Sequence, residues 1–271
     1  MQRSICLRGI ALAILLLVVA AGMASGGQRV YEERFTDGRL SLDWAPFPGF
    51  SPDRLEAVPD PQAPGGDSWA GRVVNAGLGG FAALPSAHRL GFRDVSVEAW
   101  IYAPVGGSDR GPLQGLAVRV DPEHGRFYRL AVQFTAPPRI TLAYVGRDTA
   151  NFPVYLRTWS EAEIPGGAPR QSGWHRLGLT AVGDALSASW NGQALPGSPI
   201  FDARIPRGSV GVYTNFVGGQ QLAETRVDGL IIRAGGSDDE SEKEVRQLLA
   251  WRDAWDPRAP ARPSPMPGVG H

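Results

Sequence analysis

The sequence WHRLGLTAVGDALSASWNGQAL occupies residues 174–195 and contains two runs in which large apolar residues alternate with small or polar ones. Leu177 and Leu179 mark the first run, and Leu186 and Trp190 mark the second. Alternation with a period of two is typical of β-strands, because successive side chains point to opposite faces of a sheet. The stretch therefore predicts two strands whose large apolar residues face a common core.

Two-residue turns complete this pattern. Gly183-Asp184 separates the runs and Asn191-Gly192 follows the second, and both pairs favour tight antiparallel turns because glycine and asparagine tolerate positive φ angles. The same alternation returns in GSVGVYTN at residues 208–215 and in ETRVDGLIIR at residues 224–233. The second half of the chain is therefore predicted to consist of antiparallel strands joined by short turns.

Similar signals extend over residues 28–235, which we predict to form one domain. The predicted strands are residues 29–35, 70–75, 81–84, 95–102, 116–121, 128–134, 140–145, 175–182, 186–191, 209–214 and 225–233. No helical periodicity of useful length interrupts them before residue 238. This density of strands and turns predicts an all-β fold, a two-sheet antiparallel jelly-roll sandwich, rather than a parallel α/β fold.

The first 24 residues have the pattern of a secretory signal peptide. Arg3 and Arg8 form a basic start, and residues 9–22 form an apolar run shorter than the ~20 residues of a membrane span. Gly22-Met23-Ala24 then fits the small-x-small rule, so we expect cleavage after Ala24. The alternative is an uncleaved N-terminal anchor.

Cysteine content and charge limit the compartment and the partners. The one cysteine, Cys6, precedes the apolar run, so the exported chain is expected to carry neither a lipid anchor nor a disulfide. Export without cysteine indicates a bacterial periplasmic or secreted protein with no membrane span after cleavage. Lys plus Arg and Asp plus Glu each number 27, so the formal net charge is zero and no strong field attracts a nucleic acid.

Residues 238–256 have a different pattern. Acidic residues begin this segment, where a helix N-terminus favours negative charge, and Val245, Leu248 and Leu249 follow at helical spacing. We predict one C-terminal α-helix, which either covers the sandwich or binds a protein partner. Residues 257–271 are too rich in proline to fold and are expected to form a disordered tail.

Several motifs in this order resemble one superfamily. They are ERFTDG and LSLDW within residues 33–44, VSVEAWIYAP at 95–104, GLAVRV at 115–120 and YRLAV at 128–132, followed by the hairpins described above. Together they resemble the concanavalin A-like lectin/glucanase superfamily, most of all the laminin-G-like and 3-keto-disaccharide-hydrolase-type domains of bacterial exported proteins. The resemblance is fairly specific for fold and poorly specific for activity, because this sandwich carries lectins, hydrolases and adhesion modules.

The resemblance implies two curved sheets, with any carbohydrate on the concave one, and allows a structural calcium ion between the first and last strands. Glu33 and Asp228 occupy comparable positions, and Asp37 adds a third oxygen donor of the kind that calcium prefers. The alternative is that Asp37 and Asp228, each followed by glycine, are ordinary turn or bulge positions. The four histidines are scattered, so the sequence supports no zinc site, and no other cofactor is expected.

One sheet face is a candidate sugar-binding surface. The residues predicted to alternate away from the core and line it are Glu98, Trp100, Tyr102, Arg119, Arg129, Gln133 and Tyr213. If their strands are adjacent, aromatic rings and guanidinium groups share one surface, and the arginines suit an acidic glycan. The alternative is that a loop covers Trp100 and Tyr102 and that Arg119 pairs with Glu98. Trp174 and Trp190 are expected to lie in the core.

Hydrolysis has less support from the residues. The glucanases of the superfamily carry an E-x-D-x-x-E run, which this chain lacks. Of the carboxylate pairs that could replace it, Asp94 and Glu98 are roughly 13 Å apart along a strand, which is too far for direct cooperation. Glu161 and Glu163 lie in a loop-like stretch. The leading hypothesis is a non-catalytic exported module that binds carbohydrate or another envelope component. The alternatives are a hydrolase acting on a glycoside or sugar derivative, and an assembly protein that binds a partner through its C-terminal helix.

Overall fold

The computed structural model describes residues 29–42, 44–45, 52–76, 84–85, 92–105, 112–121, 123–134, 137–150, 152–216 and 222–235. The chain divides into two compact units, Met1–Ser237 and Asp238–His271. The second unit lies outside the described residues, as do the predicted signal peptide, C-terminal helix and tail. Within the part of the chain that the structure describes, no helix has the length and hydropathy needed to cross a bilayer.

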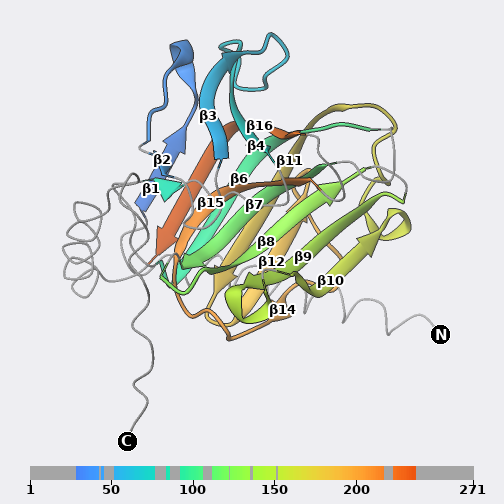
Figure 1. The fold of residues 1–271 in the computed structure, drawn as a ribbon. Coiled ribbons are helices and arrows are strands. Elements are labelled where there is room, and N and C mark those ends of the chain that lie inside the picture. The colour runs from blue at the N-terminus through green and yellow to red at the C-terminus, as the bar shows by residue number, and fades with distance from the viewer. Residues whose placement is uncertain are drawn as a thin grey trace, which may run out of the picture. The chain divides into compact units, whose positions relative to one another are not determined.

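The described residues are almost entirely β-structure (Figure 1). The strands are β1 (Arg29–Glu33), β2 (Trp44–Ala45), β3 (Pro52–Pro59), β4 (Trp69–Ala76), β5 (Leu84–Pro85), β6 (Asp94–Ala103), β7 (Pro112–Asp121), β8 (Arg126–Gln133), β9 (Arg139–Gly146), β10 (Val154–Ser160), β11 (Gly173–Val182), β12 (Ala185–Trp190), β13 (Gln193–Ala194), β14 (Ile200–Phe201), β15 (Ser209–Phe216) and β16 (Leu222–Gly235). The short 3₁₀ helices are η1 (Thr36–Gly38), η3 (Arg147–Thr149) and η4 (Glu161–Glu163).

Two large sheets form the sandwich. The nine-stranded sheet has the order β13-β12-β11-β6-β16-β4-β3, with β1 paired to β16 and β14 to β12. The five-stranded sheet has the order β10-β9-β8-β7-β15, and β2 and β5 form a separate pair. Neighbouring strands run antiparallel in both large sheets. The predicted all-β, two-sheet antiparallel sandwich is therefore confirmed.

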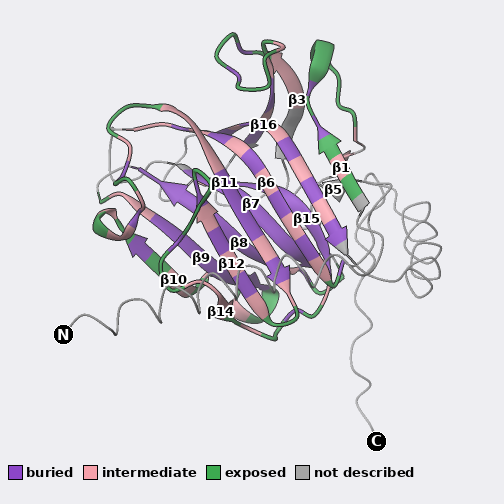
Figure 2. Cartoon of the chain, turned by 180° about the vertical axis from the view of Figure 1, so that it is seen from behind, coloured by how far each residue is buried: buried purple, intermediate pink, exposed green. Residues whose placement is uncertain are grey.

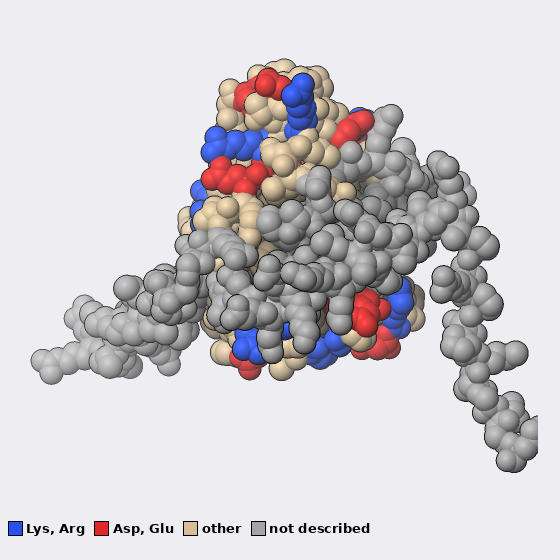
Figure 3. Space-filling view, turned by 90° about the vertical axis from the view of Figure 1, so that its left-hand side faces the viewer, with Lys and Arg blue, Asp and Glu red and all other residues tan. Residues whose placement is uncertain are grey.

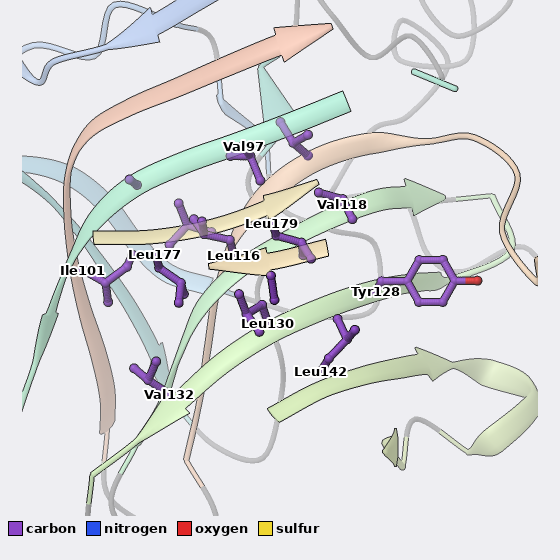
Figure 4. Close-up of a cluster of buried hydrophobic side chains, with 14 of the residues drawn as sticks. Val97, Ile101, Leu116, Val118, Tyr128, Leu130, Val132, Leu142, Leu177 and Leu179 are labelled. Carbon is purple, nitrogen blue, oxygen red and sulfur yellow. The ribbon is translucent and has the colours of Figure 1, made fainter. Parts of the chain in front are cut away.

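The main core lies between the two sheets. Figure 4 shows Leu177 and Leu179 of β11 on one side of this core and Leu130 of β8 on the other. Leu177, Leu179, Leu186 and Trp190 have exposed fractions of 0, 0, 0 and 1%. The register predicted from their alternation is confirmed, and burial of such side chains is the main term that stabilises a sandwich of this kind.

The β11–β12 hairpin has the predicted turn chemistry. Leu177 pairs directly with Trp190, and Gly183 in the connecting turn has a φ of 56°. The following turn contains Asn191 at 49° and Gly192 at 78°, so both central residues are left-handed, as a tight β12–β13 connection requires. Local sequence therefore determines the register of these strands.

Two of the longer strands were not predicted, and neither were the two-residue strands β2, β13 and β14. β3 begins and ends with proline, and β10 has a β-bulge between Tyr155 and Arg157 that breaks the alternation of its side chains. Of the predicted strand at residues 81–84, only Leu84 belongs to the described part, where it begins β5. Bulges and prolines hide strands from a period-two pattern because they interrupt the period without ending the pairing.

Candidate functional site

The seven predicted ligand-binding residues do not share one surface. Glu98, Trp100 and Tyr102 lie on β6, whose neighbours are β11 and β16 in the nine-stranded sheet. Gln133 and Tyr213 lie in the five-stranded sheet, together with Arg129. The prediction of a single face is wrong because β6 and β7, consecutive in sequence, belong to opposite sheets.

The outer face of the nine-stranded sheet is half-exposed and its charges are paired. Figure 2 shows buried and intermediate residues alternating along β6 and β16. Glu98 accepts from Arg176 at 2.9 Å and from Arg233 at 3.4 Å. The ring of Tyr102 packs edge-on against Trp174 at 5.7 Å, so Trp174 lies on this face rather than in the predicted core. These contacts leave the charged groups of the face largely satisfied.

Arg119 is a structural residue at one end of the sandwich. Its side chain is completely buried, and its guanidinium donates to the carbonyl oxygens of Ile205 at 2.7 Å and Arg93 at 3.0 Å and to that of Gly183. Its φ of 50° lies in a β-bulge of β7, which turns the side chain away from the sheet face that simple alternation predicts. Both the predicted ligand role and the alternative pairing with Glu98 are therefore unsupported by its contacts. Burial lowers the pKa of Arg119.

The outer face of the five-stranded sheet has a floor of small residues. The strand registers place two rows across it, Gly211–Ala117–Arg129–Ala143–Tyr155 and Tyr213–Gly115–Ala131–Thr141–Thr158. Large side chains thus stand at Arg129 and at the two margins, and the positions between them are small. Gly115 is required by close approach, because an added Cβ would overlap the carbonyl oxygen of Leu130.

Arg129 is the most unusual side chain of this face. Its exposed fraction is 1%, and its guanidinium carbon lies 4.8 Å from the ring centre of Tyr213 and 5.9 Å from that of Tyr155. Its Nε and Nη1 atoms are buried and have no hydrogen-bond partner. Buried polar groups are nearly always hydrogen-bonded, so these atoms mark a position where an acceptor is expected.

Polar groups continue this face beyond Arg129. Gln133 accepts from Arg139 through Oε1 at 2.9 Å. Asn215 donates through Nδ2 to the hydroxyl oxygen of Tyr213 at 3.2 Å, and its own Oδ1 is buried without a donor. The site therefore combines two aromatic rings, guanidinium donors and amide groups, the mixture that fixes the orientation of a polar ligand.

Acidic residues are missing from the described outward positions of these five strands. Those positions are Leu113, Gly115, Ala117, Val120, Phe127, Arg129, Ala131, Gln133, Arg139, Thr141, Ala143, Val145, Tyr155, Thr158, Ser160, Ser209, Gly211, Tyr213 and Asn215. Elsewhere charges are mixed: Figure 3 shows basic and acidic side chains of the described residues interspersed on the side of the molecule that it presents. Among its described residues, this face therefore has arginines without carboxylates, next to a buried apolar cluster on the same side of the sheet. The cluster consists of Leu113, Ala117, Val120, Phe127, Ala131, Val145 and Tyr213.

The three predicted calcium ligands do not come together. Both oxygens of Glu33 are occupied by N–H donors: Phe35 and Ser41 donate to Oε1, and Leu42 and the indole of Trp44 donate to Oε2, at 2.8–3.1 Å. No group of three or more His, Cys, Asp or Glu side chains suited to a metal occurs among the described residues. Glu33 organises the loop after β1 through these bonds, which corrects its predicted role as a calcium ligand.

Asp37 and Asp228 take the alternative role as turn and bulge residues. Asp37 is exposed in η1 with a φ of 57°. Asp228 is fully buried beside a register shift of β16, where it accepts from the backbone of Gly65 at 2.5 Å and Gly229 at 2.6 Å. Burial raises the pKa of Asp228, and these donors oppose the shift.

Tyr155 and Arg139 belong to the face but were not predicted as site residues. Tyr155 was missed because β10 was not predicted, and Arg139 because it precedes the predicted strand at residues 140–145. Alternation could have identified Arg139 as a residue of this face, because it is two positions from Thr141 and pairs with Gln133 across the strands. Tyr213 and Gln133 are buried, each at 3% exposure, whereas Tyr155 is half-exposed at 49%. The site therefore reaches solvent at Tyr155, on the β10 edge of the sheet.

No protein-family model and no curated protein matches the chain. Among solved structures, it is similar to the carbohydrate esterase vb_24B_21 from Shiga toxin-encoding bacteriophage phi24B (13% identity, TM-score 0.49, 78% of this chain and 100% of that one). It is also similar to the cellulose induced protein Cip1 (14%, 0.49, 74% and 96%) and to the carbohydrate binding module CBM66 from Bacillus subtilis (11%, 0.43, 72% and 93%). At these values the similarities assign neither a family nor a ligand, and the concanavalin A-like superfamily stays a resemblance.

Proposed function

We propose that this protein is a non-catalytic, exported carbohydrate-binding module whose ligand lies on the outer face of the five-stranded sheet. The observation that carries the proposal is the buried guanidinium of Arg129, which has tyrosine rings on both sides and two nitrogen atoms without acceptors. Such atoms are costly to bury unless something fills their hydrogen-bonding capacity. A hydroxyl-rich ligand would supply acceptors to Arg129 and an apolar ring face to the half-exposed Tyr155.

Binding without catalysis agrees with the residues of this face. Glycoside hydrolysis commonly uses two carboxyl groups, about 5–5.5 Å apart in retaining enzymes and about 6.5–9.5 Å apart in inverting ones. The described outward positions contain arginine, glutamine, threonine and tyrosine instead. Hydrolysis and assembly through residues 238–256 remain the competing functions, and the second involves a segment outside the described residues.

Export is the second component of the proposal, and its support is the sequence of the first 24 residues. A protein released by signal cleavage would encounter envelope or environmental polysaccharides as ligands. Mass spectrometry of the periplasmic or secreted protein is expected to show a new N-terminus at Ser25. Full-length protein held in the inner membrane would support the uncleaved anchor instead.

A matched pair of tyrosines tests the location of the site. Tyr155→Ala removes a half-exposed ring of the proposed face, and Tyr102→Ala removes a half-buried ring on the opposite sheet. Loss of an aromatic anchor is expected to weaken glycan affinity by about 1–3 kcal/mol in the first variant only. Affinity is measured by calorimetry with a polysaccharide selected from a glycan array. Weakening by Tyr102→Ala or Trp100→Ala alone would place the ligand on the nine-stranded sheet and contradict the proposed site.

A further inference from the structure

Three arginines of the described residues lie over tyrosine rings, and they differ in their partners. Arg204 lies 4.4 Å from the ring of Tyr144, and Arg226 lies 5.4 Å from that of Tyr102. Arg129, at 4.8 Å from Tyr213, has the same type of contact. A cation over an aromatic face is attracted by the ring but receives no hydrogen-bond acceptor from it. The N–H groups of each guanidinium must therefore be satisfied by other groups.

Two of these arginines have carboxylate partners. Arg204 donates through Nε to Asp202 Oδ2 at 3.0 Å, and Arg226 donates to Asp60 at 3.2 Å and Glu224 at 3.0 Å. Their side chains are 39% and 42% exposed, so water can also satisfy them. In this protein, an arginine stacked on tyrosine thus has an acidic partner even where solvent is available.

Arg129 is the exception. It is the most buried of the three, at 1% exposure, and no carboxylate pairs with it among the described residues. Its partners in register are Ala117 and Ala143, and the Arg139–Gln133 pair lies four residues further along β8. A buried charge normally has a counter-charge, because desolvation penalises an unpaired ion strongly. Among the described residues, Nε and Nη1 of Arg129 therefore have neither a counter-charge nor an acceptor.

We propose that the ligand itself supplies this counter-charge: the protein binds an acidic glycan and places an oxyanion, a carboxylate or a sulfate, against Arg129. The inference rests on the proposed carbohydrate-binding function and adds its ligand class. A planar guanidinium presents parallel N–H donors that match the oxygens of such groups. The half-exposed ring of Tyr155 would contact the apolar face of the same sugar, and the buried ring of Tyr213 holds the guanidinium in place. Selectivity then comes from this local charge, because the formal net charge of the chain is zero.

Matched polymers separate the charge from the sugar. The purified protein is titrated with polygalacturonate and with fully methyl-esterified polygalacturonate, which has the same backbone without the charge. Dextran sulfate and dextran form the second pair, so the two pairs distinguish carboxylate from sulfate. One charge-assisted contact is expected to favour the acidic member of one pair by about 10- to 100-fold.

Variants then assign the selectivity to one side chain. Arg129→Gln is expected to remove the preference for the acidic polymer, and Arg129→Lys to retain part of it, since a lysine keeps the charge but loses the planar donor pair. Arg176→Gln, on the opposite sheet, is the control and should bind like the parent. Circular dichroism checks that each variant is folded, and Arg129→Lys decides the question if Arg129→Gln is not.

The outcomes distinguish this inference from the function on which it rests. Equal affinity for charged and neutral members of both pairs, with loss of binding in Tyr155→Ala, overturns the inference and leaves the carbohydrate-binding proposal standing. If Arg129→Gln is folded and keeps the preference for the acidic polymer, the selectivity belongs to another site and the inference is overturned. If Arg129→Gln is unfolded, an undiminished preference in Arg129→Lys has the same meaning. Failure to bind any polymer in the panel or any glycan on the array overturns both.

Discussion

Replacing Arg119 with methionine tests whether this buried arginine holds one end of the sandwich together. Its guanidinium donates to the carbonyl oxygens of Ile205 at 2.7 Å and Arg93 at 3.0 Å, and to that of Gly183. These carbonyls belong to the segment before β15, the residue before β6 and the β11–β12 turn, so one side chain joins segments next to strands of both sheets. Methionine keeps much of the aliphatic volume and removes all three bonds.

The expected loss follows from these contacts. Hydrogen bonds from a charged donor contribute about 1.5–3 kcal/mol each, so three would sum to about 4.5–9 kcal/mol. Burial of the charge opposes this gain and is the reason that the pKa of Arg119 is lowered. We expect a net destabilisation of about 3–5 kcal/mol, the usual result of breaking a buried charged network. For a domain of this size, that corresponds to a fall in Tm of roughly 6–20 °C.

Calorimetry and urea unfolding of the variant and its control measure this loss. Arg176→Met is the matched control, because Arg176 pairs with Glu98 on the surface with its side chain 41% exposed and such pairs contribute at most about 1 kcal/mol. If Arg119→Met melts within about 2 °C of the control, roughly half a kcal/mol, water satisfies the carbonyls and the structural role is refuted. Unchanged stability with lost glycan binding would restore the ligand role predicted from the sequence.

Three further perturbations test other parts of the structure. Glu33→Gln should lower stability by about 2–4 kcal/mol, since an amide nitrogen would face N–H donors, whereas calcium or EDTA should leave the Tm of the parent unchanged. In the folded protein the pKa of Asp228 is raised above its ordinary value of 3.8, so the free energy of unfolding should fall as the pH rises from 3.8 through the folded pKa. Asp228→Asn should flatten this part of the pH profile measured by urea unfolding. An unchanged slope would show that Asp228 is not the group responsible. Deleting residues 257–271 should leave the Tm unchanged, whereas deleting from residue 238 should lower it by several degrees; equal Tm values would favour a partner-binding helix.

Local patterns predicted the strands that have regular alternation and strong turns. The β11–β12 hairpin was predictable in full, because Leu177 and Trp190 alternate inward and glycine occupies the turn position with a φ of 56°. β10 was not predictable in the same way, since its bulge after Tyr155 interrupts the period. Alternation in one sequence predicts the sheet face to which a side chain points, and it does so only where no β-bulge interrupts the strand.

The candidate site shows the same limit at the level of strand pairing. Alternation correctly placed Glu98 and Trp100 on one face of β6, and Arg129 and Gln133 on one face of β8. Alternation contains no information on which strands become neighbours. In the structure, β6 and β8 belong to opposite sheets. The left-handed bulge at Arg119 removed a further residue from the predicted set.

The buried or stacked arginines of this fold differ in the hydrogen-bond acceptors that surround their guanidinium groups. Both terminal nitrogen atoms of Arg119 donate to carbonyl oxygens, and only its Nε has no acceptor, whereas Arg204 is paired with a carboxylate. Arg129 has the burial of the first and the ring contact of the second, but its Nε and Nη1 have no acceptor. Stability alone would favour an apolar residue at such a position, because a well-packed hydrophobic side chain avoids the desolvation of an unpaired charge. If the proposed acidic ligand pairs with this charge, it should stabilise the protein by an amount that grows with the logarithm of the ligand concentration divided by Kd.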